Sequence, residues 1–196
     1  MRVDELARWL GDDFPNLAER CRIVREIGSG LQAHFHGSAF EMVQSSNNSA
    51  EALVHAVTAH FPAFRDEAIY QGGQVAFYKR AQIFTADVAG ALPKFFKFDD
   101  IEQLTMFADY RIPQLLRDKQ VLEYAPDLAK AVDSEQEIDP GCAWESEIRG
   151  CTIYAVSALA SLVNIPDYKL DWLLWQMGES TQAEMKPHHR VRTMYY

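Results

Sequence analysis

Apolar residues follow the helical period through most of the chain. Leucine, isoleucine and valine recur three to four positions apart over residues 17–31 and again over residues 50–61. This spacing places apolar side chains on one face of a helix, as expected for amphipathic helices that pack on a core. Ser49 is a suitable N-cap for the second helix, and Pro62 ends it because proline disfavours helix in the residue before it.

The same spacing predicts a helix over residues 78–92, closed by Pro93. Further helices are predicted over residues 101–107, with Asp99 and Glu102 in capping positions, and over residues 110–119, 128–132, 144–163 and 168–177. One short hairpin is predicted over residues 68–77, around the turn at Gly72 and Gly73. With no internal repeat or Pro/Gly/Ser linker, the sequence predicts a mainly α, single domain over residues 1–196 with one short β-hairpin.

Composition and charge narrow the classes of partner. The 196 residues are 48% hydrophobic and 12% aromatic, which is typical of a folded globular protein. The 19 basic and 28 acidic residues give a net charge of -9, which opposes the counterion-releasing contacts that bind long nucleic acids. No apolar stretch reaches the roughly eighteen residues of a membrane span, and the N-terminus MRVDELARWLGDD lacks a signal-peptide core. We therefore expect neither long nucleic acid nor a membrane as partner.

The metal-binding residue types form no recognisable site. Cys21, Cys142 and Cys151 make no CxxC pair and match no zinc spacing with the histidines, so reduced thiols in a cytoplasmic protein are the simplest interpretation. His188 and His189 are adjacent, and their side chains are expected to point apart. No metal or cofactor is predicted, and the glycine-rich, GxSxG and HExxH motifs are absent.

Asp109 and Lys79 are the charged residues with the most chemical interest. Asp109 lies between two predicted helices, where a carboxylate most often caps the helix that follows. A carboxylate at a helix start can also stay ionised and face a pocket, so the structural and functional interpretations are compatible. Lys79 and its neighbour Arg80 stand in the first turn of the predicted helix over residues 78–92, where solvated surface charges are the commoner use.

Two other groups remain ambiguous from the sequence. Glu145, Glu147 and Arg149 begin the longest predicted helix, where acids stabilise the positive helix end in any protein. The segment over residues 186–192 is the one basic cluster of an acidic chain and is suited to a single phosphate group.

Longer strings resemble a known family. They are FPAFRDEAIYQGGQVAFYKRAQIFTADVAGALP, FDDIEQLTMFADYRIPQLLRD, ESEIRGCTIYAV, LDWLLWQ and PHHRVRTMYY, and they carry in order a resemblance that runs from about residue 16 to the end. In these strings the chain resembles the C-terminal part of the queuosine salvage family. The resemblance implies a fold related to helix-hairpin-helix DNA glycosylases and hydrolysis of queuosine 5′-monophosphate to queuine, for use in tRNA modification, and ribose 5-phosphate.

The resemblance also implies roles for individual residues. Asp109, from the MFADYR string, and Lys79, from the YKRAQ string, are the implied catalytic residues. They are expected to approach each other, with Asp109 stabilising the oxocarbenium ion and activating water. The implied substrate-binding residues are Phe107, Tyr110 and Trp172 for stacking, Glu147 and Asp171 for the amine of queuine, and His189, Arg190 and Arg192 for the 5′-phosphate.

Family members generally carry a further N-terminal segment, so the pocket is expected to be open on one side. The alternatives left open are a natural short form, a shortened piece of the protein, and a homo-oligomer in which a partner subunit completes the site. A non-catalytic module that binds the nucleotide or the 7-deazaguanine base is the alternative function, and retention of Asp109 and Lys79 argues against it. A glycosylase that flips bases from a duplex is disfavoured by the charge of -9.

Overall fold

A computed structural model describes all 196 residues, and helices make up most of it. The helices are α1 (Val3–Leu10), α2 (Leu17–His34), α3 (Ala39–Ser45), α4 (Ala50–His60), α5 (Lys79–Ala91), α6 (Arg111–Asp118), α7 (Pro126–Asp133), α8 (Ala143–Val163) and α9 (Asp167–Thr181). The strands are β1 (Glu67–Tyr70), β2 (Gly73–Ala76), β3 (Glu137–Ile138) and β4 (Arg190–Val191). Short 3₁₀ turns cover Pro62–Phe64, Ile101–Gln103 and Gln182–Glu184. The predicted mainly α class is confirmed.

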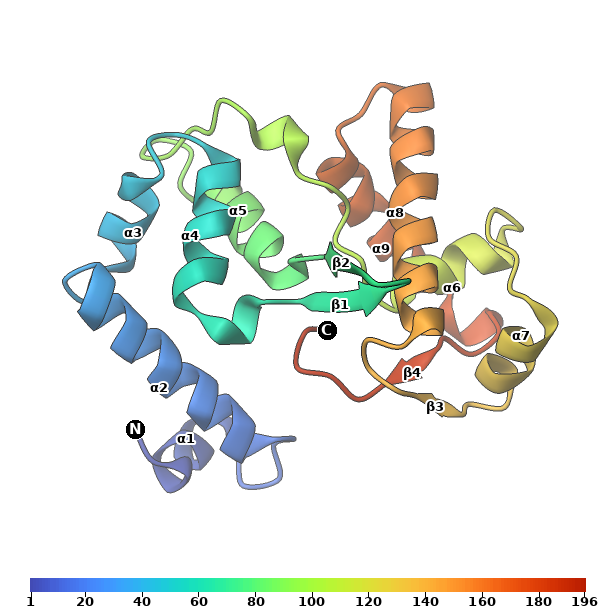
Figure 1. Cartoon of the computed structure of the whole chain (residues 1–196), viewed down its shortest axis with the longest axis horizontal. Helices are drawn as coiled ribbons and strands as arrows, with labels where there is room; N and C mark the ends of the chain where they lie inside the picture. The colour runs from blue at the N-terminus through green and yellow to red at the C-terminus, as the bar shows by residue number, and fades with distance from the viewer.

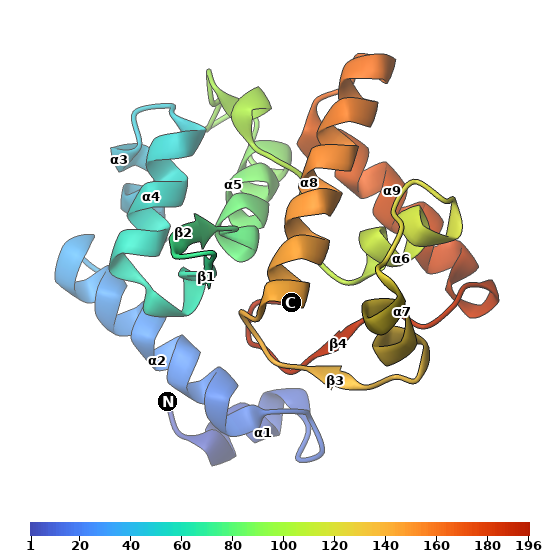
Figure 2. The same cartoon turned by 45° about the vertical axis from the view of Figure 1, so that its right-hand side comes forward.

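The helices form two groups that lie side by side (Figures 1 and 2). We call α2 to α5 the first helical group and α6 to α9 the second helical group. After α9 the chain runs back through β4, and its C-terminus lies between the two groups (Figures 1 and 2). The candidate residues Lys79 and Asp109 belong to different groups, so their meeting depends on how the groups pack. The single domain over residues 1–196 stays a prediction.

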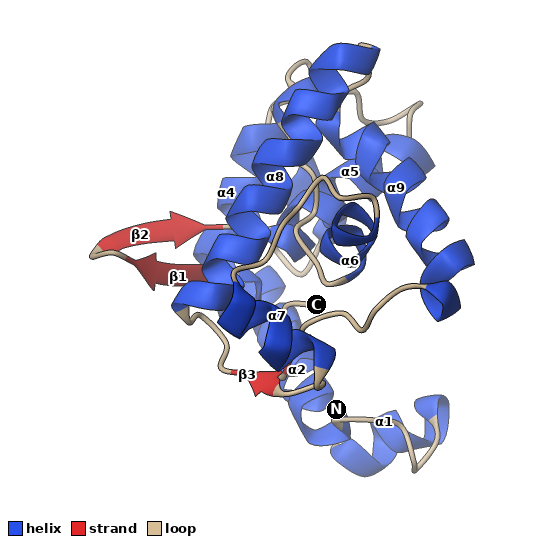
Figure 3. Cartoon of the chain, turned by 90° about the vertical axis from the view of Figure 1, so that its right-hand side faces the viewer, coloured by secondary structure: helices blue, strands red, loops and turns tan.

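The predicted hairpin is confirmed as the antiparallel pair β1 and β2, in which Glu67 lies opposite Ala76. Its turn places Gln71 and Gly72 at φ values of 50° and 81°, in the left-handed region that glycine adopts at low cost. The hairpin projects from the helices in Figure 3. The pairing of β3 with β4 is parallel, joins residues far apart in the sequence, and was not predicted.

The predicted caps of the fourth helix are also confirmed. Ser49 accepts a hydrogen bond from the backbone N–H of Ala52 at 3.1 Å, and the helix ends at His60, ahead of Pro62. Asp100 adds a second cap from a distant loop, because its carboxylate accepts hydrogen bonds from the Ser49 hydroxyl and from the Ala50 backbone. The loop after α5 is thereby tied to the start of α4.

The predicted helix over residues 101–107 is wrong. Only the 3₁₀ turn Ile101–Gln103 forms, and the chain then has no regular secondary structure until α6 begins at Arg111. The backbone N–H groups of this segment are used by side chains from other helices: Thr105 donates to Gln82 at 2.9 Å, and Phe107 donates to Asp171 at 2.8 Å. Tertiary hydrogen bonds therefore replace the helical ones. The helices α1 and α3 were not predicted.

Close packing of α6 on α9 fixes the second helical group. A Cβ atom added at Gly178 of α9 would lie 2.8 Å from Cγ of Arg111, so glycine permits this approach. The buried guanidinium of Arg111 then donates hydrogen bonds to Glu179 of α9 and to Gln182, which follows that helix. Buried apolar residues such as Met106, Ile112 and Val156 complete the core between the helices.

None of the single helices has the length and apolar composition needed to cross a membrane. Helices α8 and α9 reach that length and composition only as a pair, and the pair is bent by 105°.

Candidate active site

Lys79 is the first residue of α5, and a buried aspartate fixes its backbone. Asp66 lies just before the hairpin, and its carboxylate accepts a hydrogen bond from the Lys79 N–H at 3.3 Å. Tyr78, at φ 47°, makes the sharp turn that leads into the helix. The Lys79 residue is half-buried; burial lowers the pKa of its ammonium, and the charges of Asp109 and Asp171 oppose that shift.

Asp109 is 5% exposed and lies at the start of α6. Its Oδ1 accepts hydrogen bonds from the backbone N–H groups of Arg111 at 2.9 Å and Ile112 at 3.1 Å, which confirms the predicted cap. Its Oδ2 has no protein donor and is not cut off from solvent. Burial raises the pKa of the carboxyl, whereas Lys79 and the two N–H groups oppose the increase.

Asp171, in α9, is the second buried carboxylate at this place and is 4% exposed. Its Oδ1 accepts the N–H of Phe107 at 2.8 Å, two residues before Asp109. Burial raises the pKa of Asp171 to about 7; the Phe107 hydrogen bond opposes this increase, and the charge of Asp109 adds to it.

We call Lys79, Asp109 and Asp171 the carboxylate–lysine cluster. Lys79 and Asp109 lie within electrostatic range of each other, since each shifts the pKa of the other although thirty positions separate them in the sequence. No direct ion pair joins the three side chains. The free oxygen of Asp109 and the ammonium of Lys79 therefore have no partner within the protein.

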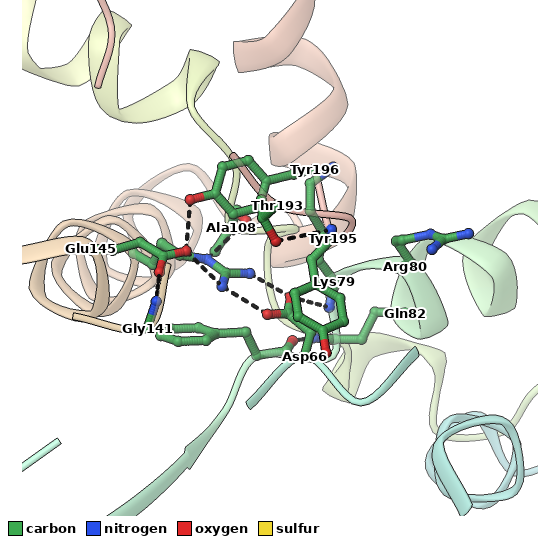
Figure 4. A network of polar contacts seen from close by, with 12 residues as sticks. Asp66, Lys79, Arg80, Gln82, Ala108, Gly141, Glu145, Thr193, Tyr195 and Tyr196 are labelled. Atoms are coloured by element: carbon green, nitrogen blue, oxygen red, sulfur yellow. Dashed lines mark hydrogen bonds and ion pairs between the residues drawn. The ribbon is translucent and has the colours of Figure 1, made fainter. Parts of the chain in front are cut away.

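A buried ion network that the sequence did not predict supports this cluster (Figure 4). Arg149 of α8 is 2% exposed and makes two hydrogen bonds to Asp66, one of them at 2.8 Å from its Nη1. Its guanidinium lies between the rings of Phe77, at 3.9 Å, and Tyr196, at 4.8 Å. Glu145 contacts Arg149 at 3.4 Å and accepts the hydroxyl of Tyr196 at 2.7 Å.

This network joins the hairpin, α8 and the end of the chain. No local signal could have found it, because Asp66 and Arg149 are 83 positions apart. Glu145 and Arg149, which looked like ordinary helix-end charges, are therefore structural partners of the loop that holds Lys79.

The basic segment near the C-terminus lines a cavity of about 470 Å³ together with Tyr110 and Tyr196. The rings of Tyr110 and His188 are 4.5 Å apart, which brings this segment beside the loop of Asp109. Arg190 pairs with Glu135 at 2.7 Å and Arg192 with Glu137 at 3.5 Å, so part of their charge is already neutralised.

His189 differs from its basic neighbours. It is 1% exposed, and neither of its ring nitrogens has a hydrogen-bond partner. Burial lowers its pKa to about 3, with His188 and Arg149 adding to the shift, so the imidazole is neutral at physiological pH. His189 therefore offers no positive charge to a phosphate, and both of its ring nitrogens are buried.

Comparison with known proteins identifies relatives over nearly the whole chain. The model of the family described as "queuosine salvage protein" matches residues 2–196. The chain belongs to the queuosine salvage family. The match therefore begins ahead of the segment around residue 16 at which the resemblance was expected to start.

Three relatives of the queuosine salvage family carry the name queuosine 5′-phosphate N-glycosylase/hydrolase. The protein of Dictyostelium discoideum is 45% identical over 200 residues, covering 98% of this chain and 62% of the relative. That of Sphaerobacter thermophilus is 45% identical over 191 residues, covering 94% and 59%, and that of Mus musculus is 38% identical over 199 residues, covering 93% and 59%. The chain thus spans about six-tenths of the length of the relatives it matches.

Three of the expected substrate-binding residues have side chains that make other contacts in the structure. Glu147 is exposed on α8, bonds the Tyr70 hydroxyl at 2.8 Å and lines a different cavity of about 390 Å³. Phe107 is 3% exposed and packs its ring in the core, so only its backbone serves the site. Trp172 is 38% exposed and packs edge-on against Tyr168.

Proposed function

We propose that this chain hydrolyses the N-glycosidic bond of queuosine 5′-monophosphate and releases queuine. The observation that carries the proposal is the buried carboxylate–lysine cluster in a chain of the queuosine salvage family. Relatives of 34–45% identity are named for this reaction. The proposal extends to a cytoplasmic location, in line with three free cysteines, and to a fold relationship with helix-hairpin-helix glycosylases.

The chemistry of the bond explains why a fixed carboxylate is useful. Cleavage of an N-glycosidic bond develops positive charge on the ribose, and a preorganised negative group beside that carbon stabilises the charge as it forms. Asp109 is suited to this role because backbone donors hold one oxygen and leave the other free. The free oxygen also serves to orient and deprotonate the attacking water.

Lys79 supports Asp109 electrostatically. Its ammonium opposes the increase in the carboxyl's pKa that burial causes, which keeps more of Asp109 in the charged form. It also offers donors to the hydroxyl groups of the sugar. The aromatic ring of Tyr110, beside Asp109 and at the cavity, provides a surface on which a planar base stacks.

The experiment that tests the function compares three substrates. The protein is incubated with queuosine 5′-monophosphate, queuosine and guanosine 5′-monophosphate, and free base is detected by mass spectrometry. Release of queuine from the first substrate, with little guanine from the third, supports the proposal. Tight binding of the queuosine nucleotide without release of base would instead identify a non-catalytic binding module.

We further propose that the cavity lined by His189, Arg190 and Arg192 receives the 5′-phosphate. The double change Arg190→Ala and Arg192→Ala should reduce the preference for nucleotide over nucleoside about tenfold, since charge-assisted hydrogen bonds are lost but exposed, partly neutralised charges are weak. The preference is measured as the ratio of the two kcat/KM values. Lys130→Ala, an exposed cation on α7 outside the cavity, is the matched control. An unchanged ratio in the double variant would make this segment structural.

A further inference from the structure

Two buried carboxylates share one site with one ammonium group. Asp109 and Asp171 are 5% and 4% exposed, and Lys79 acts on the pKa values of both. If both carboxylates were ionised, the site would carry an excess negative charge in a place where burial makes charge costly. Neighbouring carboxyl groups in such sites relieve this by holding one proton between them. The same repulsion favours a single proton held by the pair of carboxylates in the carboxylate–lysine cluster.

The other charged groups around the cluster do not remove this excess. Arg149 of α8 is engaged by Asp66. Arg111 of α6 is engaged by Glu179 of α9. Each of these arginines already has a carboxylate partner. Lys79, Asp109 and Asp171 together therefore keep an excess of negative charge when both carboxylates are ionised.

Hydrogen bonds decide which carboxylate keeps the charge. Asp109 accepts two backbone N–H groups at the positive end of α6, and both interactions favour its ionised form. Asp171 accepts one backbone N–H and lies inside α9, away from the helix end. Burial raises the pKa of both carboxyls, and these hydrogen bonds favour the charge on Asp109 and the proton on Asp171, whose pKa is about 7.

We propose that Asp171, in its protonated form, donates the proton that the departing base takes up, while Asp109 stays charged beside the sugar. This inference rests on the proposed function. A purine is helped to leave by protonation at N7, but a 7-deazaguanine has carbon at that position, so the departing base must take up its proton at another atom. The free oxygen of Asp171 is not cut off from solvent. A protonated carboxyl also suits this role better than the binding of the ammonium group of queuine.

The step balances with water as the only co-reactant. The bond between C1′ and the base nitrogen breaks, its electron pair goes to the base, and the base takes the proton of Asp171. Water adds its oxygen to C1′ and gives one proton to Asp109. A proton then passes from Asp109 to Asp171, which restores the starting state. Nothing is oxidised or reduced.

The test uses Asp171→Asn, which keeps an oxygen able to accept the Phe107 N–H but has no acidic proton. General acid catalysis typically contributes about a hundredfold to ten-thousandfold in rate, so we expect a loss of that size on queuosine 5′-monophosphate. The loss should be under about threefold on the 4-nitrophenyl riboside 5-phosphate, because nitrophenolate leaves without a proton. Asp167→Asn, at the partly exposed start of the same helix, is the matched control.

Two further measurements keep the inference testable without the artificial substrate. Activity of the wild-type protein should fall above about pH 7 as Asp171 loses its proton, and this alkaline limb should be absent in Asp171→Asn. Carbon-13 NMR of the aspartate carboxyls should find one group that titrates near neutrality, with a lower midpoint in Asp109→Asn because a neighbouring negative charge is gone.

The outcomes separate this inference from the proposed function. Near-normal turnover of queuosine 5′-monophosphate by Asp171→Asn, an unchanged alkaline limb, or titration of Asp171 in the ordinary carboxyl range would each overturn it. If the wild-type protein released no base from any substrate, the proposed function would fail and the acid role with it. The carboxyl titration would still decide whether the pair holds a proton.

Discussion

Asp109→Asn should lose at least about a hundredfold to a thousandfold in the rate of queuine release, because a preorganised charge beside a developing cation typically contributes that much. Loss of the base that activates water deepens the defect. The protein should remain folded, since asparagine keeps an oxygen that accepts the N–H groups of Arg111 and Ile112. Single-turnover rates with queuosine 5′-monophosphate provide the measurement.

The interpretation of this variant depends on binding and folding measured beside the rate. Binding of the nucleotide should survive, because stacking and phosphate contacts do not involve the Asp109 carboxylate. The melting temperature should change little, as relief of a buried charge is offset by the loss of a negative charge that stabilises the Lys79 ammonium. Near-normal turnover would remove Asp109 from catalysis, and loss of activity together with folding would leave only the cap.

Asp66→Ala should destabilise the protein by about 3–5 kcal/mol, because it leaves the buried guanidinium of Arg149 without its main partner. For a chain of this length, that corresponds to a decrease of roughly 6–20 °C in Tm. Activity should fall as well, since Asp66 also holds the backbone of Lys79. Circular dichroism during heating measures the stability.

Two controls show whether burial of the ion pair between Asp66 and Arg149 is the cause of the lost stability. Glu135→Ala removes the exposed partner of Arg190, and it should leave the Tm unchanged because exposed pairs contribute little. The double change Asp66→Leu and Arg149→Met removes both charges, and it should recover part of the stability that Asp66→Ala loses. A double variant less stable than the single one would contradict this account of the network.

The sequence predicted the elements whose causes are local. The amphipathic helices, the Ser49 cap and the hairpin follow from residues within a few positions of one another, and all are present. The Asp109 cap was also correct, for the same reason. The predicted helix over residues 101–107 failed because Gln82 and Asp171, from two different helices, bind its backbone N–H groups.

The residues of the candidate site also differ in how far the sequence predicts them. Lys79 and Asp109 were identified only through the family strings, since their spacing alone indicates a surface charge and a cap. Asp171 was expected to bind the amine of queuine, and nothing in its local sequence reveals that it lies beside Asp109. Glu147 has an acidic side chain of the expected type, but helix geometry turns it to the outer face of α8, where it meets Tyr70.

The cluster is built from both helical groups, and this has a consequence for how the protein loses activity as it unfolds. Helical hydrogen bonds lie within each helix, whereas Lys79 comes from one group and Asp109 and Asp171 from the other. A partly opened molecule in which the groups have separated keeps its helices and has no site. Low concentrations of denaturant should therefore abolish catalysis before helix content declines, so turnover reports on the packing of the groups and circular dichroism on the helices themselves.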